Sequence, residues 1–306
     1  MNASRAELDA VVVGAGVVGL AIARQLAQNG LSVAVLEQES QPGQHTSSRN
    51  SGVIHAGFYY PQDSLKASLC VRGKAMLYDY CQARDIGHRQ CGKLVLAQEE
   101  EDCSSLNRLQ AQGKTNGVAD LEIWDADQLA KEEPQMRAHM ALFSPSTGIV
   151  DAAGLLLALE TDLLAAGGLM VCHSQVTNVR HRDGCFEVHY RDGDGVHQLH
   201  CEQLVNAAGL NASALAHQLP GADNVAIPAT RWARGNYFSL TGAAPASRLI
   251  YPLPDEHGLG IHLTLDLQGQ ARFGPDVEWS DTLDYRANAE KLNVFVEAIR
   301  QYWPAL

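Results

Sequence analysis

Positive charge is scarce in this chain of 306 residues, which carries 23 Lys and Arg against 35 Asp and Glu for a formal net charge of −12. This balance argues against a nucleic-acid partner, because a phosphate backbone is bound by clustered Lys and Arg. No apolar run approaches the roughly 20 residues of a membrane span. The first nine residues lack the charged-then-apolar pattern of a signal peptide. We expect a cytoplasmic protein, with peripheral contact at the inner face of a membrane left open.

Cysteine motifs are absent as well. The seven cysteines are widely spaced, and no C-x-x-C pair occurs among them. Neither a zinc site nor a redox disulfide is predicted, so no metal is expected. Scattered thiols are typical of a reducing compartment. With 46% hydrophobic and 19% charged residues, the composition is that of a globular protein with one large core or two modest domains.

The most informative stretch follows Asp9. Val11 to Val13 form a short apolar run that predicts a buried parallel strand, and three glycines then follow in G-x-G-x-x-G spacing at the start of a helix. The first glycine permits a tight turn, the second lets a pyrophosphate approach the backbone, and the third lets the helix pack against the strand. The helix N-terminus attracts phosphate. The predicted dinucleotide contacts here are Gly14, Gly16, Val17, Val18 and Gly19.

The next segment completes a nucleotide-binding pattern. Asn29-Gly30 is a suitable helix C-cap, and Leu31 to Leu36 predicts a second strand. Glu37 at its end can accept hydrogen bonds from a ribose diol, with Gln38 beside it. We predict that both residues contact the cofactor.

A second strand–turn–helix pattern occurs at Leu204 to Ser213, where a buried strand runs into Ala207, Ala208 and Gly209. Such small residues let the backbone lie against a dinucleotide. A nicotinamide-binding unit would reach its third strand soon after Glu37, whereas here some fifty residues of polar loop and helix intervene. This excursion and the late Ala-Ala-Gly turn favour FAD.

The remaining periodicity predicts two interleaved domains of α/β class. Helices are expected from Ser64, from Asp125 and over 152–166, and a hairpin turns at Asp183-Gly184. From Ala226 onward the pattern is β-rich, with strands over 233–240, 249–253, 259–265 and 271–273 and a final helix over 282–302. We predict a Rossmann-like FAD-binding domain of the glutathione-reductase type (1–85 plus 145–225). The second, antiparallel-sheet α+β substrate domain would comprise 86–144 plus 226–306.

Five further stretches carry a family pattern: Asn50–Tyr60, Ser64–Gly73, Arg234–Phe238, Tyr251–Pro254 and Gly258–Thr264. With them the chain resembles FAD-dependent oxidoreductases of the D-amino-acid oxidase and glycerol-3-phosphate dehydrogenase type, and is most similar to L-2-hydroxyglutarate oxidases and dehydrogenases. The resemblance implies non-covalent FAD and oxidation of a 2-hydroxy acid, L-2-hydroxyglutarate to 2-oxoglutarate, by hydride transfer to flavin N5. Family members continue beyond this C-terminus with a flavin-contacting loop, so we expect a longer natural chain.

Oxidation of a hydroxy acid needs a base for the hydroxyl proton, and a neutral imidazole is suitable because its pKa lies near working pH. His55, inside the Asn50–Tyr60 motif, is the first candidate. His262 is the second, on a predicted alternating strand where it shares a face with Thr264. A hydrogen-bonded structural imidazole is the alternative interpretation of each.

A dicarboxylate substrate requires cationic or N–H donors. Lys66, Arg231 and Arg234 are the cations nearest the motifs, and a solvated surface charge is the alternative for each. Tyrosine hydroxyls, including that of Tyr59, are further candidates. The predicted substrate contacts are Tyr60, Lys66, Arg234, Tyr237, Tyr251 and Thr264.

Polar residues of the loop after Glu37 are predicted to donate to the pyrophosphate or the flavin ring: Thr46, Ser47, Ser48, Asn50 and Ser51. Ordinary turn chemistry is the alternative. Val176 is assigned to the adenine through its backbone by the resemblance alone.

Two other functions stay open. One is an amine or amino-acid oxidase on the same fold, acting on glycine, sarcosine or D-amino acids. The other is a flavin-binding protein without turnover. The electron acceptor, which could be oxygen, a quinone or another carrier, also stays open.

Overall fold

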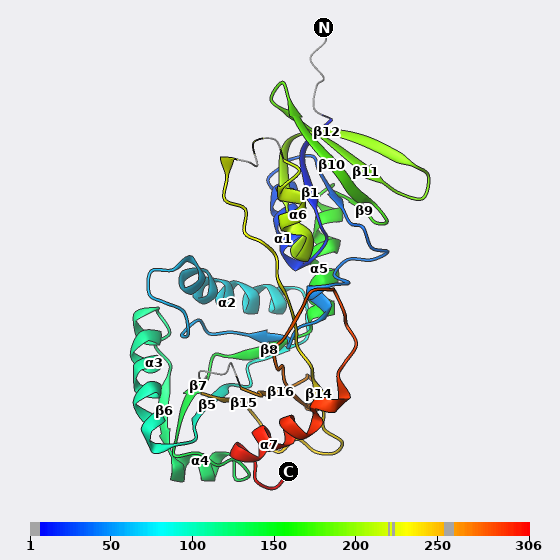
Figure 1. The fold of residues 1–306 in the computed structure, drawn as a ribbon. Coiled ribbons are helices and arrows are strands. Elements are labelled where there is room, and N and C mark those ends of the chain that lie inside the picture. Colours follow the sequence, from blue (N-terminus) through cyan, green and yellow to red (C-terminus); the bar gives the residue numbers. More distant parts are fainter. Residues whose placement is uncertain (1–6, 220, 222–223, 254–259) are drawn as a thin grey trace. The chain divides into compact units, whose positions relative to one another are not determined.

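The computed structural model describes residues 7–219, 221, 224–253 and 260–306, which form two compact units (Figure 1). The first contains residues 1–50 and 152–231, and the second contains residues 51–151 and 232–306. The predicted domains are interleaved in the same way, but the boundaries differ, because 51–85 and 145–151 belong to the second unit and 226–231 to the first. The reason is that β3 (Val53–Ile54) pairs with β8 (Gly148–Val150), which also pairs with β4 (His88–Arg89).

The first unit is built on one six-stranded sheet. Its strands, in spatial order, are β10 (Gln175–Arg182), β11 (Cys185–Arg191), β12 (Val196–Asn206), β1 (Leu8–Val13), β2 (Val33–Leu36) and β9 (Leu169–Val171). Pairing is parallel from β12 through β9 and antiparallel across β10, β11 and β12. The separate short strand predicted at Leu204 is wrong. The eleven residues of β12 form one strand, because its first half pairs with β11 and its second half, from Cys201, pairs with β1.

Two helices pack together in the first unit. Helix α1 (Val17–Gln28) contacts α5 (Ala152–Ala165), and the Arg24 Nε lies 2.8 Å from the Asp162 Oδ2 between them. The Asp162 side chain is buried, and its charge is therefore compensated by the guanidinium. Shorter helical segments follow the strands: η1 (Thr46–Ser48), η3 (Gly209–Asn211) and α6 (Ala212–Ala216).

A seven-stranded sheet forms the centre of the second unit. Its spatial order is β14 (Phe238–Ser239), β17 (Ala271–Phe273), β16 (Leu263–Leu265), β15 (Leu249–Pro252), β5 (Lys93–Ala97), β7 (Met140–Ser144) and β6 (Glu122–Asp125). A separate two-stranded ribbon pairs β13 (Trp232–Arg234) with β18 (Glu278–Ser280). All pairs in the large sheet are antiparallel except β15 with β5.

Different helices cover the two faces of this sheet. Leu94 and Leu96 of β5 pack in one cluster with Phe295 of α7 (Leu292–Tyr302). On the opposite face, Val95 and Ala97 of β5 pack with Leu106 of α3 (Cys103–Thr115). Figure 1 shows α3 beside β5, β6 and β7. Because successive side chains of a strand point to opposite faces, Lys93 lies on the α3 side with Val95 and Ala97.

The helix starts predicted at Ser64 and Asp125 are confirmed. The Ser64 hydroxyl accepts a hydrogen bond from the Ala67 N–H at 3.1 Å, at the start of α2 (Leu65–Ala83). The Asp125 carboxylate accepts one from the Gln128 N–H at 2.8 Å, at the start of α4 (Ala126–Glu132). Each side chain satisfies a backbone donor that has no partner within the helix. Helix α3 follows a turn at η2 (Glu100–Asp102).

Three predictions for the C-terminal part are wrong in extent. The strand over 233–240 is broken between β13 and β14, where the Asn236 N–H donates to the Asp276 carboxylate. Of the strand predicted over 259–265, residue 259 lies outside the described residues and only β16 is a strand in the rest, so His262 lies immediately before it. The helix over 282–302 begins at η5 (Ala289–Lys291), because Asn288 caps it and Asp284 bonds the Arg286 backbone.

All seven cysteines of the chain are free thiols. Within the residues that the structure describes, no helix has the length and apolar character needed to cross a membrane.

Two helix glycines provide a matched test of the first unit. A Cβ on Gly19 would lie 2.0 Å from the Gly14 carbonyl oxygen, whereas a Cβ on Gly73 in α2 would meet nothing within 4 Å. We expect Gly19→Ala to lower the free energy of unfolding by about 2 kcal/mol or more. Gly73→Ala should raise it by about 0.5–1 kcal/mol through helix propensity. Chemical denaturation of both variants measures this, and equal effects would contradict the close packing of α1.

Candidate functional site

The carboxyl ends of three parallel strands in the first unit bring the predicted dinucleotide contacts together. Gly14 follows β1, Glu37 follows β2, and Ala207 follows β12. The Gly14 N–H donates to the Leu36 carbonyl at 2.8 Å, and the Ala207 N–H donates to the Val13 carbonyl at 3.0 Å. Ligands of open α/β sheets bind at this end of the strands.

Two glycines leave the room that a dinucleotide needs at this end. Gly14 has a φ of +100°, and a Cβ there would lie 2.5 Å from the Ala207 carbonyl oxygen. The turn therefore tolerates no side chain, and the backbone stays accessible. Gly16, at the start of α1, has only the Ser47 hydroxyl within reach of a Cβ, at 3.2 Å. These residues fit the pyrophosphate of a dinucleotide such as FAD.

Glu37 stabilises the turn that follows β1 through hydrogen bonds to the backbone. Its carboxylate oxygens accept the Ala15 N–H at 2.7 Å and the Glu39 N–H at 2.9 Å, and the side chain is only 8% exposed. Each carboxylate oxygen can accept more than one hydrogen bond. The carboxylate therefore keeps capacity for the ribose hydroxyls that the sequence assigned to it.

The remaining predicted cofactor residues divide between the two units. The Ser47 hydroxyl accepts the Val17 N–H at 3.0 Å, and the Asn50 amide donates to the Ser47 carbonyl at 2.8 Å, so both lie at the first turn of α1. Thr46 and Ser48 lie with Ser47 in η1. The Gln38 amide contacts Glu39 and His45, and the Val18 side chain is exposed. Val176 lies on β10, the edge strand of the sheet, beside a register shift. Ser51 alone belongs to the second unit, where its hydroxyl bonds that of Tyr237 at 2.8 Å.

A buried lysine defines the candidate substrate site in the second unit. Lys93 is 0% exposed, and its Nζ has no hydrogen-bond partner among the described residues. The Nζ lies 4.6 Å from the ring centre of Phe58, 4.5 Å from that of Tyr59 and 4.7 Å from that of Tyr251. We call these three rings the aromatic cage. Aromatic faces attract a cation, but they do not replace the hydrogen bonds that an ammonium makes in water.

Helix α3 holds the loop that supplies two rings of the aromatic cage. The Gln112 amide donates to the carbonyls of Phe58 at 3.0 Å and Tyr60 at 2.9 Å. One turn later, the Asn116 amide donates to the carbonyls of Gly57 at 3.3 Å and Tyr60 at 2.9 Å. Residues four apart on a helix share a face, and these two amides fix the loop backbone over β5.

His55 lies beside Lys93 and is the first predicted base. Its Nδ1 is buried and has no hydrogen-bond partner in the part of the chain that the structure describes. Burial, followed by the positive charges of Lys93, His262 and Lys66, lowers the pKa of His55 to about 3. Burial likewise lowers the pKa of Lys93 to about 7, and no carboxylate opposes this shift. The His55 imidazole is therefore neutral at physiological pH, with one ring nitrogen able to accept a proton.

His262 takes part in the same cluster without the strand that was predicted for it. Its ring stacks on Tyr251 with centroids 3.6 Å apart, and it is 7% exposed. Ile261, Leu263 and Thr264 are buried too, so both faces of this segment are covered rather than one. Thr264 donates its hydroxyl to the Arg272 carbonyl at 3.2 Å.

Lys66 and Tyr60 form the rim of this cluster. The Lys66 Nζ lies 4.7 Å from the Tyr60 ring centre, and the Lys66 charge is one of those that lower the pKa of His55. Cys70, one turn along α2, donates its thiol to the His55 carbonyl at 3.6 Å. The structure therefore brings together five predicted residues: His55, His262, Tyr60, Lys66 and Tyr251.

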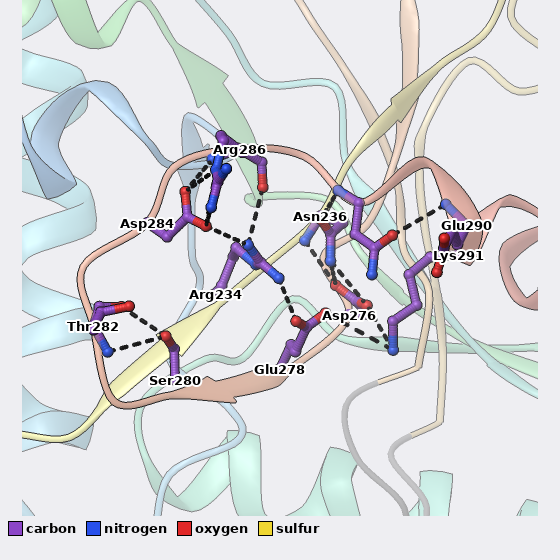
Figure 2. A network of polar contacts seen from close by, with 11 residues as sticks. Arg234, Asn236, Asp276, Glu278, Ser280, Thr282, Asp284, Arg286, Glu290 and Lys291 are labelled. Carbon is purple, nitrogen blue, oxygen red and sulfur yellow. Dashed lines mark hydrogen bonds and ion pairs between the residues drawn. The ribbon is translucent and has the colours of Figure 1, made fainter.

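Arg234, by contrast, is committed to a structural network. Figure 2 shows its guanidinium between the carboxylates of Glu278 and Asp284, with the Asp284 contact at 3.1 Å. Hydrogen bonds from Arg286 and the charge of Arg234 lower the pKa of Asp284 to about 2. This network ties the β13–β18 ribbon to the segment before α7. The guanidinium is thus engaged by two carboxylates of the chain itself, which leaves Arg234 a poor carboxylate receptor.

Two further predicted residues, Arg231 and Tyr237, are not among the five that the Lys93 cluster brings together. Arg231 lies in the first unit, outside the Lys93 cluster. Tyr237 bonds Ser51, and the Arg272 guanidinium lies 4.8 Å from its ring centre. Sequence reasoning does not predict Lys93, because it lies in no recognised motif. A lone lysine at the start of the apolar run Leu94–Ala97 is the sequence signal that could have indicated it, and the structure buries it there in β5.

The sequence matches a known protein family and curated relatives over most of its length. The FAD dependent oxidoreductase family matches residues 9–306. The mitochondrial L-2-hydroxyglutarate dehydrogenase of Arabidopsis thaliana is 38% identical over 99% of this chain and 71% of its own length. The chain spans between 59% and 71% of the length of the first curated relatives it matches.

Solved structures show the same fold. L-α-glycerophosphate oxidase from Mycoplasma pneumoniae, with FAD bound, superposes with a TM-score of 0.88 at 23% identity, covering 98% of this chain and 79% of the other. Glycine oxidase from Geobacillus kaustophilus gives a TM-score of 0.82 at 20% identity, covering 97% and 78%. The Rossmann-like domain with an antiparallel substrate domain, predicted from sequence, is confirmed at the level of fold.

The buried Lys93 amine should cost stability in a pH-dependent way. Because the pKa falls from 10.5 to about 7, the unfolded chain binds more protons than the folded chain between these values. Stability of the wild-type protein should therefore rise with pH across this window, and the full cost remains below pH 7. Lys93→Met should raise the free energy of unfolding at pH 7 by roughly 1–4 kcal/mol and remove part of that rise.

Urea denaturation at pH 7, 8 and 9 measures this effect, with the exposed Lys131→Met as the matched control. A Lys93→Met protein with the pH dependence of the wild type would show that Lys93 is not the titrating group.

Proposed function

The chain belongs to the family of FAD-dependent oxidoreductases, and on this basis we propose that it oxidises L-2-hydroxyglutarate to 2-oxoglutarate. The observation that carries the proposal is a pair of buried nitrogens in the second unit, the Lys93 Nζ and the His55 Nδ1, neither of which has a hydrogen-bond partner among the described residues. The first is a cation suited to an acid, and the second is a base suited to a hydroxyl. The name of the 38% identical Arabidopsis thaliana relative supports the choice of substrate.

The first unit supplies the cofactor site. The backbone at Gly16 and the N-terminus of α1 would hold the pyrophosphate, and the Glu37 carboxylate would accept the ribose hydroxyls. FAD, when bound, supplies a two-electron acceptor for the hydride that leaves C2 of the substrate.

The second unit supplies the proton chemistry. In our proposal, the His55 Nδ1 takes the hydroxyl proton as the carbonyl forms at C2. A general base contributes roughly a hundred- to ten-thousand-fold to such a step. The positive charges that depress the pKa of His55 are offset when a dianionic substrate lies among them. Substrate binding would thereby bring the basicity of His55 toward the working pH.

The same charges weigh against an amine substrate. Lys93 and Lys66 both place positive charge around His55, and a protonated amine in this cluster would be repelled. Glycine oxidase shares the fold at 20% identity, which concerns the fold alone. For the location, we retain the cytoplasm as a proposal, although the curated relatives are mitochondrial by name.

The first test is anaerobic mixing of the FAD-loaded protein with each enantiomer of 2-hydroxyglutarate. We expect L-2-hydroxyglutarate to bleach the oxidised-flavin absorbance and the D enantiomer to leave it unchanged. Bleaching by glycine, sarcosine or D-amino acids, with none by L-2-hydroxyglutarate, would assign the protein to the amine oxidases. Bleaching by none of them would overturn the proposed function.

A second test addresses the base. His55→Gln should slow flavin reduction by L-2-hydroxyglutarate by roughly a hundred- to ten-thousand-fold, because glutamine cannot take up the hydroxyl proton. The exposed His139→Gln is the matched control and should leave the rate unchanged. Stopped-flow absorbance under anaerobic conditions measures both, and an undiminished rate in His55→Gln would exclude His55 as the base.

A further inference from the structure

The groups that the structure places around the Lys93 amine cannot neutralise it. The loop over 55–60 contributes His55, Phe58 and Tyr59, and β15 contributes Tyr251. His262 approaches from the segment before β16, and Ser144 of β7 lies opposite Lys93 in the ladder. Helix α2 contributes the thiol of Cys70 and the charges of Lys66 and Lys74. No carboxylate is among these groups, so the described surroundings offer the amine no counter-ion.

Such an arrangement is unusual because buried charges are normally paired. Two nearby cations, Lys66 and Lys74, add to the positive potential rather than cancelling it. Burial raises the pKa of the Cys70 thiol, so Cys70 stays protonated at neutral pH and provides no negative charge. Burial also raises the pKa of Tyr59 and of Tyr251, which therefore remain neutral hydroxyls. Among the described residues, therefore, no group supplies the negative charge that the ammonium form of Lys93 needs.

We infer that Lys93, held in the aromatic cage beside His55, is the receptor for one carboxylate of the dicarboxylate substrate. The inference rests on the proposed function and deepens it, since it assigns the substrate charge to a residue outside the family motifs recognised in the sequence. The carboxylate would accept charge-assisted hydrogen bonds from the Lys93 ammonium. The three rings, having no charge of their own, position the amine without competing for it.

This assignment couples binding to proton uptake. In the free site the pKa of Lys93 is about 7, so above this value most of the protein carries a neutral amine. A carboxylate binds the ammonium form, and by linkage it raises the proton affinity of that amine. The dissociation constant of a dicarboxylate should therefore rise about tenfold per pH unit above pH 7, and each bound molecule should take up close to one proton at pH 8 to 9.

The test uses glutarate, a dicarboxylate with no hydroxyl group to oxidise, titrated calorimetrically into the FAD-loaded protein. We expect binding that weakens from pH 7 to pH 9, and an observed heat that varies with the ionisation enthalpy of the buffer in the sense of proton uptake. These wild-type measurements need no variant. Absence of glutarate binding, or binding with no proton uptake at pH 8 to 9, would overturn the inference.

Variants then assign the effect to Lys93. Lys93→Met should weaken glutarate binding at pH 7 by at least about 30-fold, as expected for loss of one partner of a buried charged pair. Lys93→Arg keeps a charge that does not titrate, so its binding should lose the pH dependence. Lys131→Met, exposed on α4, should bind as the wild type does. Wild-type affinity and pH dependence in a folded Lys93→Met protein would overturn the inference.

The outcomes remain separate from those of the flavin assay. Glutarate binding that depends on Lys93, with no bleaching by L-2-hydroxyglutarate, would retain the carboxylate receptor and reject the proposed substrate. Bleaching by L-2-hydroxyglutarate that survives Lys93→Met with an unchanged KM would retain the proposed function and reject the receptor.

Discussion

Removal of the Lys93 amine from water, with no counter-ion among the described residues, is the constraint around which the second unit is arranged. An isolated ammonium in an apolar environment is costly, and proteins usually avoid it by pairing or by loss of the proton. Here the chain surrounds the amine with the aromatic cage, and α3 holds the loop that supplies Phe58 and Tyr59. Residues that serve a reaction often lower stability in this way, because they are arranged for the substrate rather than for the empty fold.

The two units solve different electrostatic problems. The first offers a phosphate-bearing cofactor the N-terminus of a helix, which is a neutral group with a positive end. The absence of side chains at Gly14 and Gly16 leaves room for the pyrophosphate beside it. In our proposal the second recognises a small acid, with the charges of Lys93 and Lys66 beside the buried His55. Because the whole chain carries a net charge of −12, an acid would find positive charge only at such a local cluster.

Arginine and lysine also perform distinct tasks within the second unit. Arg234 presents a planar fork to Glu278 and Asp284, and the resulting network fixes the β13–β18 ribbon (Figure 2). Lys93 presents a point charge that can gain or lose its proton in the physiological range. The first is a structural cation held by two carboxylates of the chain, whereas the second is the cation to which we assign the substrate carboxylate.

The sequence by itself determined the elements whose signals are local. Strand, glycine spacing, helix cap and acidic residue follow one another at 9–37, and the caps at Ser64 and Asp125 depend only on neighbouring backbone donors. His55 was predicted differently, through the family resemblance of the motif that contains it. Tertiary structure alone decided the roles of Arg234 and Lys93. Arg234 meets Asp284 fifty residues along the chain, and Lys93 meets rings from 58, 59 and 251 through strand pairing that no local pattern records. The charge of a side chain is written in the sequence, but its partner depends on which distant segments the fold places around it.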